Sequence, residues 1–217
     1  MMRLAGRTAI VMGVESPAGT AIARALAKAG ATLHLVSADR PRVEALAAGL
    51  DASLLATDDE GPAAPDLVVD ASALPAMPDR MTSEEDWEET FIRANRPVAR
   101  LAARADRMPD KGAILLVTAV PAAVETGGWL MPMLAWREAA VAALARETAA
   151  RGLRVNGLAP VMDAGGGLPG FLQPAAARPR AGTAAPVEVA EAALWLLGAG
   201  MATGLTLALD GGRRLQA

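Results

Sequence analysis

Short apolar runs alternate with longer helical segments along this chain, and this alternation constrains the fold most strongly. Thr8–Met12 is a compact, mostly apolar run, as is typical of a strand buried on both faces of a parallel sheet. Gly13 ends the run, Ser16 can cap a helix, and Pro17 suits the first helical position. The pattern continues to the C-terminus. It predicts an α/β fold of the Rossmann type, a doubly wound parallel sheet with strand order 3-2-1-4-5-6-7.

The other elements follow from the same periodicities. The predicted strands are 8–12, 32–36, 53–56, 67–69, 113–118, 154–158 and 205–209, and the predicted helices are 17–29, 41–50, 82–108, 133–151 and 186–197. Thr82 and Glu85 have the spacing of a capping box at the start of the third helix. No internal repeat or change of composition divides the chain. We therefore expect a single domain over residues 1–217, in which the Gly- and Pro-rich segment 162–185 forms a flexible flap.

The third and fourth strands are joined by a short connection. Only about eight residues, 58–65, lie between them, whereas a helical crossover normally takes a dozen or more. Eight extended residues reach about 26–29 Å, which is enough to cross the sheet without a helix. The sequence therefore predicts that the helix between strands three and four is missing. Either a partner covers that face, or the strands there are shortened.

Composition excludes several classes of function. The net charge of −3, with no run of basic residues, gives no electrostatic footprint for nucleic acid. The chain has no cysteine and a single histidine, His34, so thiolate chemistry and a multi-histidine metal site are excluded and we expect no metal. No stretch reaches the roughly 18 apolar residues of a membrane helix, and no signal peptide is recognisable. We expect a cytoplasmic protein that binds neither nucleic acid nor membrane.

Five motifs occur in the order in which one known family carries them. They are the loop Met12-Gly-Val-Glu-Ser-Pro-Ala-Gly19, the strand end Asp70-Ala-Ser-Ala73, the helical Asn95, the strand Arg154-Val-Asn-Gly-Leu-Ala-Pro160, and Thr203-Gly204 followed by Asp210-Gly-Gly212. Taken together, these motifs resemble the short-chain dehydrogenase/reductase family over nearly the whole chain. The resemblance implies the fold, but a fold alone does not give a function.

The resemblance also implies a catalytic tetrad of tyrosine, lysine, serine and asparagine. In this chain Leu134 aligns with the tyrosine, Glu138 with the lysine and Ala119 with the serine, so that only Asn95 matches. Leucine has no proton to give, and the chain contains no tyrosine that a shifted alignment could bring into the site. Loss of a positioned acid or base typically removes about 10² to 10⁴ in rate. The sequence therefore predicts a degenerate active site.

The cofactor loop departs from the family pattern as well. By resemblance, the residues that would contact a dinucleotide are Gly13, Ser16, Gly19, Ser37, Arg40, Asp58 and Ala71. Pro17 replaces a glycine and removes an N–H donor, and Glu15 adds a negative charge beside the expected phosphates. Ser37 stands where NAD enzymes carry an acidic residue, and Arg40 could reach a 2′-phosphate. The sequence leaves open whether a dinucleotide binds, and favours NADP over NAD if one does.

Three hypotheses follow from these features. The first is a non-catalytic or regulatory subunit in a homo- or hetero-oligomer, paired with an active short-chain dehydrogenase/reductase through helices 82–108 and 133–151. In that case Trp129 and Trp136 lie at a helix interface rather than in a cavity. The second is an NAD(P)-dependent oxidoreductase, or a lyase, isomerase or cyclase, that uses Glu138 or Asp163. The third is a small-ligand-binding protein with a pocket beneath the flap.

Overall fold

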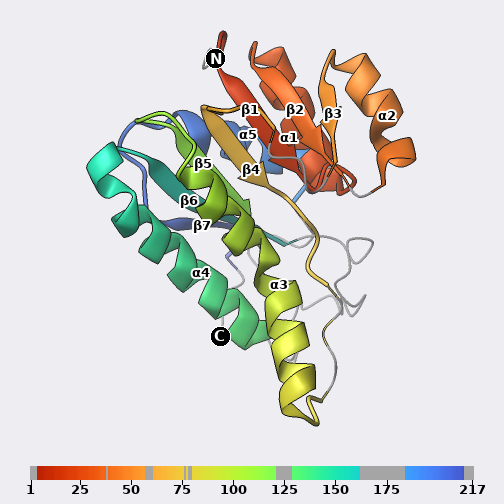
Figure 1. Ribbon diagram of the computed structural model, residues 1–217, viewed down its shortest axis with the longest axis vertical. Helices are drawn as coiled ribbons and strands as arrows, with labels where there is room; N and C mark the ends of the chain where they lie inside the picture. Colours follow the sequence, from red (N-terminus) through yellow and green to blue (C-terminus); the bar gives the residue numbers. More distant parts are fainter. Residues whose placement is uncertain are drawn as a thin grey trace.

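A seven-stranded parallel sheet forms the centre of the molecule (Figure 1). The computed structural model describes residues 4–37, 39–56, 61–75, 77, 80–120, 129–161 and 184–212. The strands are Thr8–Met12 (β1), Thr32–Val36 (β2), Ser53–Leu55 (β3), Leu67–Asp70 (β4), Ala113–Val117 (β5), Arg154–Pro160 (β6) and Thr206–Leu209 (β7). They lie in the order β3-β2-β1-β4-β5-β6-β7, which is the predicted single-domain Rossmann arrangement.

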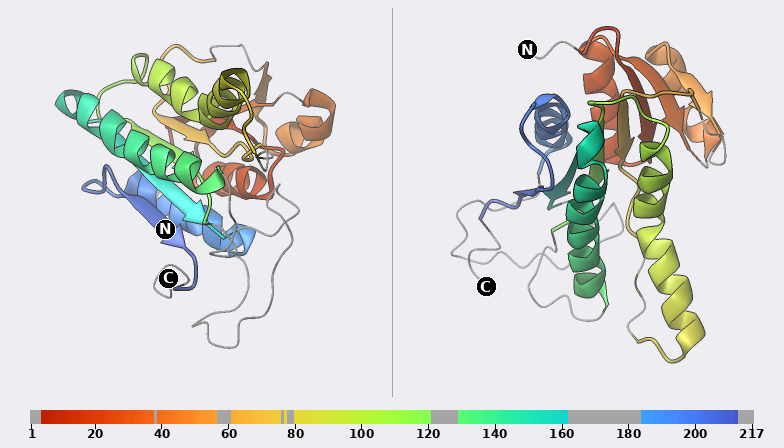
Figure 2. Two further views of the ribbon diagram at one scale, coloured as in Figure 1. Left: turned by 90° about the horizontal axis from the view of Figure 1, so that it is seen from below. Right: turned by 60° about the vertical axis from the view of Figure 1, so that its left-hand side comes forward.

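Helices cover both faces of the sheet (Figure 2). The helices are Pro17–Lys28 (α1), Arg40–Gly49 (α2), Glu84–Ala105 (α3), Leu130–Glu147 (α4) and Pro186–Gly198 (α5). On one face, α1, α2 and α5 pack against alternate strand residues such as Val11 and Leu115. On the other face, α3 and α4 pack against the intervening residues, such as Ile10 and Ile114. Each central strand is therefore buried on both faces, which explains its continuous apolar run.

The connection between β3 and β4 contains no helix within residues 61–66, and residues 57–60 lie outside the described part of the chain. Gly61 has φ +70°, and a Cβ there would lie 2.9 Å from Leu55 Cδ1 and 3.2 Å from Ile10 Cδ1. The connection thus runs directly over the α3 side of the sheet. The strands it joins are short, since β3 has three residues and β4 has four. This agrees with the predicted short crossover and shortened strands.

Two helix starts differ from their sequence predictions. Ser83, rather than Thr82, caps α3, because its side chain accepts a hydrogen bond from the Asp86 N–H at 3.1 Å. The Thr82 N–H and hydroxyl instead donate to the Asp86 carboxylate. The helix predicted over 133–151 begins at Leu130 and ends at Glu147, and a single 3₁₀ turn, Ala149–Arg151, follows it. A capping-box pattern does not distinguish adjacent hydroxyl residues.

The N-terminal halves of α3 and α4 extend side by side beyond the edge of the sheet (Figures 1 and 2). Most of the predicted flap lies outside the described residues, which resume at Ala184. Within the described part of the chain, no helix is both long enough and apolar enough to cross a membrane.

Candidate functional site

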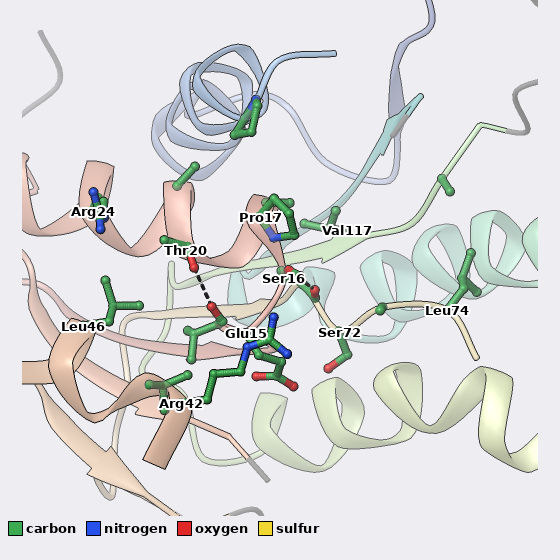
Figure 3. A pocket seen from close by; sticks show the side chains of 18 of the residues that line it. Glu15, Ser16, Pro17, Thr20, Arg24, Arg42, Leu46, Ser72, Leu74 and Val117 are labelled. Carbon is green, nitrogen blue, oxygen red and sulfur yellow. Dashed lines mark hydrogen bonds between the residues drawn. The ribbon is translucent and has the colours of Figure 1, made fainter. Parts of the chain in front are cut away.

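A cavity of about 910 Å³ opens where β1, β4 and β5 end, beside the first turn of α1 (Figure 3). Ligands of open α/β sheets bind at this carboxyl edge, where neighbouring connections diverge to opposite faces. Its wall is largely apolar and is formed by the β1–α1 loop, α1, α2, the segment after β4, the end of β5 with the residues that follow it, and the first residue of α5. The polar and charged residues that line it are Glu15, Ser16, Thr20, Arg24, Arg42, Ser72 and Thr118.

Gly13 and Gly19 hold the β1–α1 loop in place. Gly13 has φ +74°, and a Cβ there would lie 2.3 Å from the Ser72 nitrogen. A Cβ on Gly19 would lie 2.2 Å from the Gly13 carbonyl oxygen. Real side chains do not tolerate such distances, so both positions require glycine. The close packing of loop, helix and β4 therefore accounts for these two glycines without any ligand.

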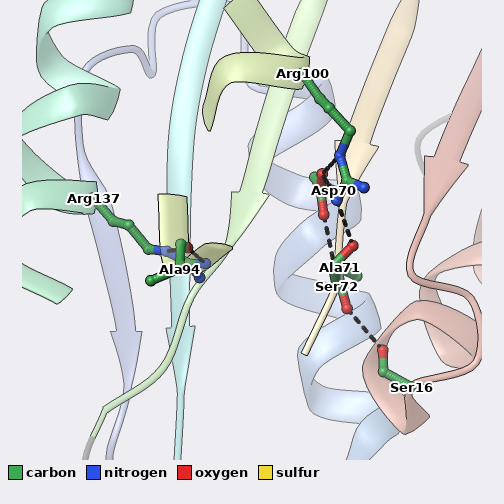
Figure 4. Close-up of polar contacts among 7 residues, drawn as sticks. All are labelled: Ser16, Asp70, Ala71, Ser72, Ala94, Arg100 and Arg137. Carbon is green, nitrogen blue, oxygen red and sulfur yellow. Dashed lines mark hydrogen bonds and ion pairs between the residues drawn. The ribbon is translucent and has the colours of Figure 1, made fainter. Parts of the chain in front are cut away.

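The loop's own contacts occupy most of the N–H groups at the start of α1. The Ser16 N–H donates to the Gly13 carbonyl at 3.1 Å, and the Gly19 N–H donates to Ser16 Oγ at 2.9 Å. Pro17 has no N–H. The Ser16 hydroxyl lies 2.8 Å from the Gly13 carbonyl and 2.9 Å from the Ala71 carbonyl, so that its single hydrogen ties the loop to β4 (Figure 4). Few donors are left for a phosphate group.

Glu15 carries a carboxylate into the same region. The residue lines the cavity and is half-buried, and its Oε2 atom is buried without a hydrogen-bond partner among the described residues. Arg42 lies near it in Figure 3, but no ion pair joins the two side chains. A dinucleotide would bring its pyrophosphate to this loop, beside a like charge. The residues present do not fit that group.

Two of the residues predicted to contact a dinucleotide, Ser37 and Arg40, lie away from the cavity. Ser37 is buried, does not line the cavity, and accepts a hydrogen bond from the Asp39 N–H at 3.0 Å. Arg40 is exposed as the first residue of α2 and does not line the cavity either. Arg42, rather than Arg40, lines the cavity from α2, together with Val43 and Leu46. The i, i+4 spacing between Arg42 and Leu46 was the available signal for Arg42. Asp58 and Asp163 lie outside the described residues.

The predicted catalytic end of the cavity is apolar. Ala119, aligned with the family's serine, is buried and lines the cavity. Leu134, aligned with its tyrosine, is buried against Ala119 and Leu130 in one cluster, with Leu74 and Met77 packed beside it. The Thr118 hydroxyl is buried without a hydrogen-bond partner among the described residues. The described residues therefore offer no proton donor at the position of the tyrosine.

The structure places Glu138 and Arg137 in opposite environments. Glu138, aligned with the family's lysine, is exposed and does not line the cavity. Its neighbour Arg137 is fully buried. Arg137 Nε donates to the Ala94 carbonyl at 3.0 Å, and Nη2 donates to the same oxygen (Figure 4). Burial lowers the pKa of Arg137 to about 10; the charge of Asp70 partly opposes this shift, and that of Arg100 adds to it.

Asn95 contributes to backbone bonding within α3. Its Nδ2 donates to the Phe91 carbonyl at 3.0 Å and contacts Met133 Sδ at 3.6 Å, while its Oδ1 is buried without a partner among the described residues. Pro97 lies inside the same helix, where a proline removes a donor and crowds the preceding turn. The Ala94 carbonyl bound by Arg137 belongs to that turn. Asn95 and Arg137 therefore bind backbone carbonyls of α3 next to Pro97, and neither lines the cavity.

A buried ion pair fixes the segment that follows β4. Asp70 is fully buried, and its Oδ2 accepts hydrogen bonds from Arg100 Nε at 3.1 Å and Nη2 at 2.8 Å. Its Oδ1 accepts from the Ser72 N–H at 3.0 Å, and Arg100 also donates to Ser72 Oγ at 2.8 Å (Figure 4). The network holds Ala71 and Ser72 at the cavity wall. The sequence indicated Ala71 but not the role of Arg100.

Comparison with known proteins supports the fold. A family model described as enoyl-(acyl carrier protein) reductase matches residues 66–214. A solved short chain dehydrogenase/reductase family protein is 26% identical with a TM-score of 0.75, covering 97% of this chain and 98% of that chain. No curated protein matches the sequence.

Two further solved structures were determined with a dinucleotide. A blue fluorescent protein from a metagenomic library, in complex with NADPH, is 22% identical with a TM-score of 0.80, covering 97% of this chain and 99% of that one. An enoyl-(acyl-carrier-protein) reductase from Anaplasma phagocytophilum, in complex with NAD, is 21% identical with a TM-score of 0.76, covering 99% of this chain and 94% of that one.

Proposed function

This chain belongs to the short-chain dehydrogenase/reductase family, and we propose that it is a member without oxidoreductase activity of its own, which acts as a regulatory subunit paired with an active relative. The observation that carries the proposal is the apolar cluster of Ala119, Leu130 and Leu134, in which the residues aligned with the family's serine and tyrosine pack together and Ala119 lines the cavity. Leucine and alanine neither donate nor accept a proton, and the chain contains no tyrosine.

The proposed partner surface lies on the N-terminal halves of α3 and α4, which extend beyond the edge of the sheet (Figures 1 and 2). Trp129, Trp87, Phe91 and Trp136 form an aromatic ladder between these helices, with ring centroids 4.9, 5.8 and 5.1 Å apart in that order. The three tryptophans are each more than a third exposed, and Ile92 is 59% exposed. Partly exposed aromatic side chains that are already held in place are favoured at protein interfaces, because little conformational entropy remains to be lost.

Native mass spectrometry of the tagged chain, purified from its source organism, tests this proposal. We expect it to co-purify with a family member that carries the tyrosine and lysine. Ile92→Lys should lower the recovery of that partner, because it places a charge on the interface. Trp195→Lys is the matched control, since Trp195 is 52% exposed on α5, on the opposite face of the sheet. Recovery only as a monomer, or only as a homo-oligomer, contradicts the proposal.

An enzyme with a non-standard site is the second candidate, favoured by the open cavity at the family's ligand position. Its predicted carboxylate, Glu138, is exposed and outside that cavity, which weakens the version that uses Glu138 as the base. NADPH oxidation by the purified chain, measured with a panel of carbonyl substrates, distinguishes the two candidates. Turnover that persists after rigorous purification would establish the enzyme and exclude the non-catalytic subunit.

A further inference from the structure

We propose that the cavity beside α1 binds a phosphate-free amphipathic molecule, which donates an N–H or O–H group to the Glu15 carboxylate, and that it rejects the pyrophosphate of a dinucleotide. This goes beyond the proposed function, since it holds whether or not the chain pairs with a partner. It rests on three features of the cavity wall: the amides of Ser16 and Gly19, which bond within the loop; Glu15 Oε2, which has no hydrogen-bond partner among the described residues; and the apolar inner end.

The first feature is the state of the α1 N-terminus. A helix start binds phosphate through free N–H groups that point at the anion. Here Ser16 and Gly19 use their N–H groups within the loop, and Pro17 has none. The N–H of Thr20 is bonded to the Ser16 carbonyl. The exposed ring of Pro17 also lines the cavity next to Ser16. Among these positions the Ala18 N–H alone makes no hydrogen bond to the described residues, so the start of the helix offers an anion little.

The second feature is Glu15. Its Oε2 is buried at the cavity wall, with no hydrogen-bond partner among the described residues. A buried charged oxygen without a partner costs free energy, which a ligand donor placed against it recovers. A phosphate oxygen at the same place adds repulsion instead. The charge of Glu15 therefore selects for a neutral donor or a cation.

The two arginines of the cavity do not cancel this selection. Arg24 and Arg42 are exposed, so that water and salt screen their charges. No ion pair joins either of them to Glu15. Arg24 lies on α1 away from Glu15, whereas the Arg42 side chain extends toward Glu15 without forming an ion pair with it (Figure 3).

The third feature is the inner end of the cavity. Leu74, Val117 and Ala119 line it, and they offer a surface for an apolar ligand body. Thr118 lines the same end of the cavity and is only 8% exposed. Its hydroxyl has no hydrogen-bond partner among the described residues. A ligand with a compact apolar body and one donor head group matches this distribution of surface.

Two probes with similar apolar bodies and opposite head-group charges test the proposal by isothermal titration. They are 2-phenylethylamine and 3-phenylpropionate. We expect the amine to bind the purified full chain at least about tenfold more tightly than the acid, as the loss of a charge-assisted hydrogen bond implies. Glu15→Gln should weaken amine binding by about the same factor. Glu44→Gln is the matched control, because Glu44 is exposed on α2 and does not line the cavity.

NADPH provides the second arm of the experiment. We expect no saturable NADPH binding to the wild-type chain, and measurable binding to the double variant Glu15→Gln, Pro17→Gly, which removes the like charge and restores an N–H. Saturable NADPH binding to the wild-type chain overturns the proposal. Tighter binding of the acid than of the amine, equal binding of both, or no binding of either also overturns it. None of these results depends on the presence of a partner subunit.

Discussion

At the scale of single residues, Gly19 shows how little freedom the cavity loop has. A Cβ at this position would meet the backbone of Gly13, which cannot move without shifting β1 or the Ser72 segment. We therefore predict that Gly19→Ala lowers the free energy of unfolding by about 2 kcal/mol or more, through overpacking against backbone. Urea denaturation measures this change.

Gly49 is the matched control for that substitution. It lies in α2, and a Cβ there would meet nothing within 4 Å. Gly49→Ala should leave stability unchanged or raise it by up to about 1 kcal/mol, because alanine restricts the unfolded chain and favours the helix. A Gly19→Ala protein as stable as the Gly49→Ala protein would show that the loop can move away from β1.

At the scale of elements, Arg137 joins α4 to α3 through the Ala94 carbonyl. Because burial lowers its pKa to about 10, the unfolded chain holds this proton more tightly than the folded chain does. The charged arginine therefore costs stability at all lower pH values. That cost falls as the pH rises through the folded pKa, so the contribution of Arg137 to stability increases with pH.

We predict that the wild-type protein gains stability relative to Arg137→Met by about 1 kcal/mol between roughly pH 9 and pH 11. Methionine is unbranched and apolar, so it fills much of the same volume and removes the titrating group. Comparing urea unfolding of the two proteins at each pH cancels the titration of all other groups. A difference that does not change with pH, or that changes in the opposite direction, would contradict this account of the buried cation.

At the scale of the whole molecule, the short connection between β3 and β4 leaves the sheet unevenly stabilised. β4 lies inside the sheet and its four residues are all buried, whereas β3 is a three-residue edge strand with no fully buried residue. We predict that native-state hydrogen exchange reaches the β3 amides by local opening, and the β4 amides only by global unfolding. Equal protection of both strands would indicate that an additional layer covers the β3 edge.

Much of the fold was predictable from the sequence, because buried parallel strands and capped helices have distinct periodicities. The absence of tyrosine could likewise be read directly from the sequence, since no folding can supply a missing side chain. The surroundings of α4 were harder to predict. Leu130, Met133, Leu134, Arg137 and Val141 form one buried stripe, and that spacing places position 137 inside. The charge of Arg137 favours an exposed position, but in the structure the side chain is buried and donates hydrogen bonds to the Ala94 carbonyl in α3.

The sequence by itself determined the sheet order, the short crossover and the apolar residues Ala119 and Leu134 at the positions that align with the family's serine and tyrosine. These depend on local spacing and on which side chains exist. Only the tertiary structure decided that Arg42 rather than Arg40 lines the cavity, that Glu138 is outside it, and that Glu15 Oε2 has no hydrogen-bond partner among the described residues. Those properties depend on which groups from distant segments come within a few ångströms of one another, and charge or hydrogen-bond pairing across such distances leaves no periodic trace in the chain.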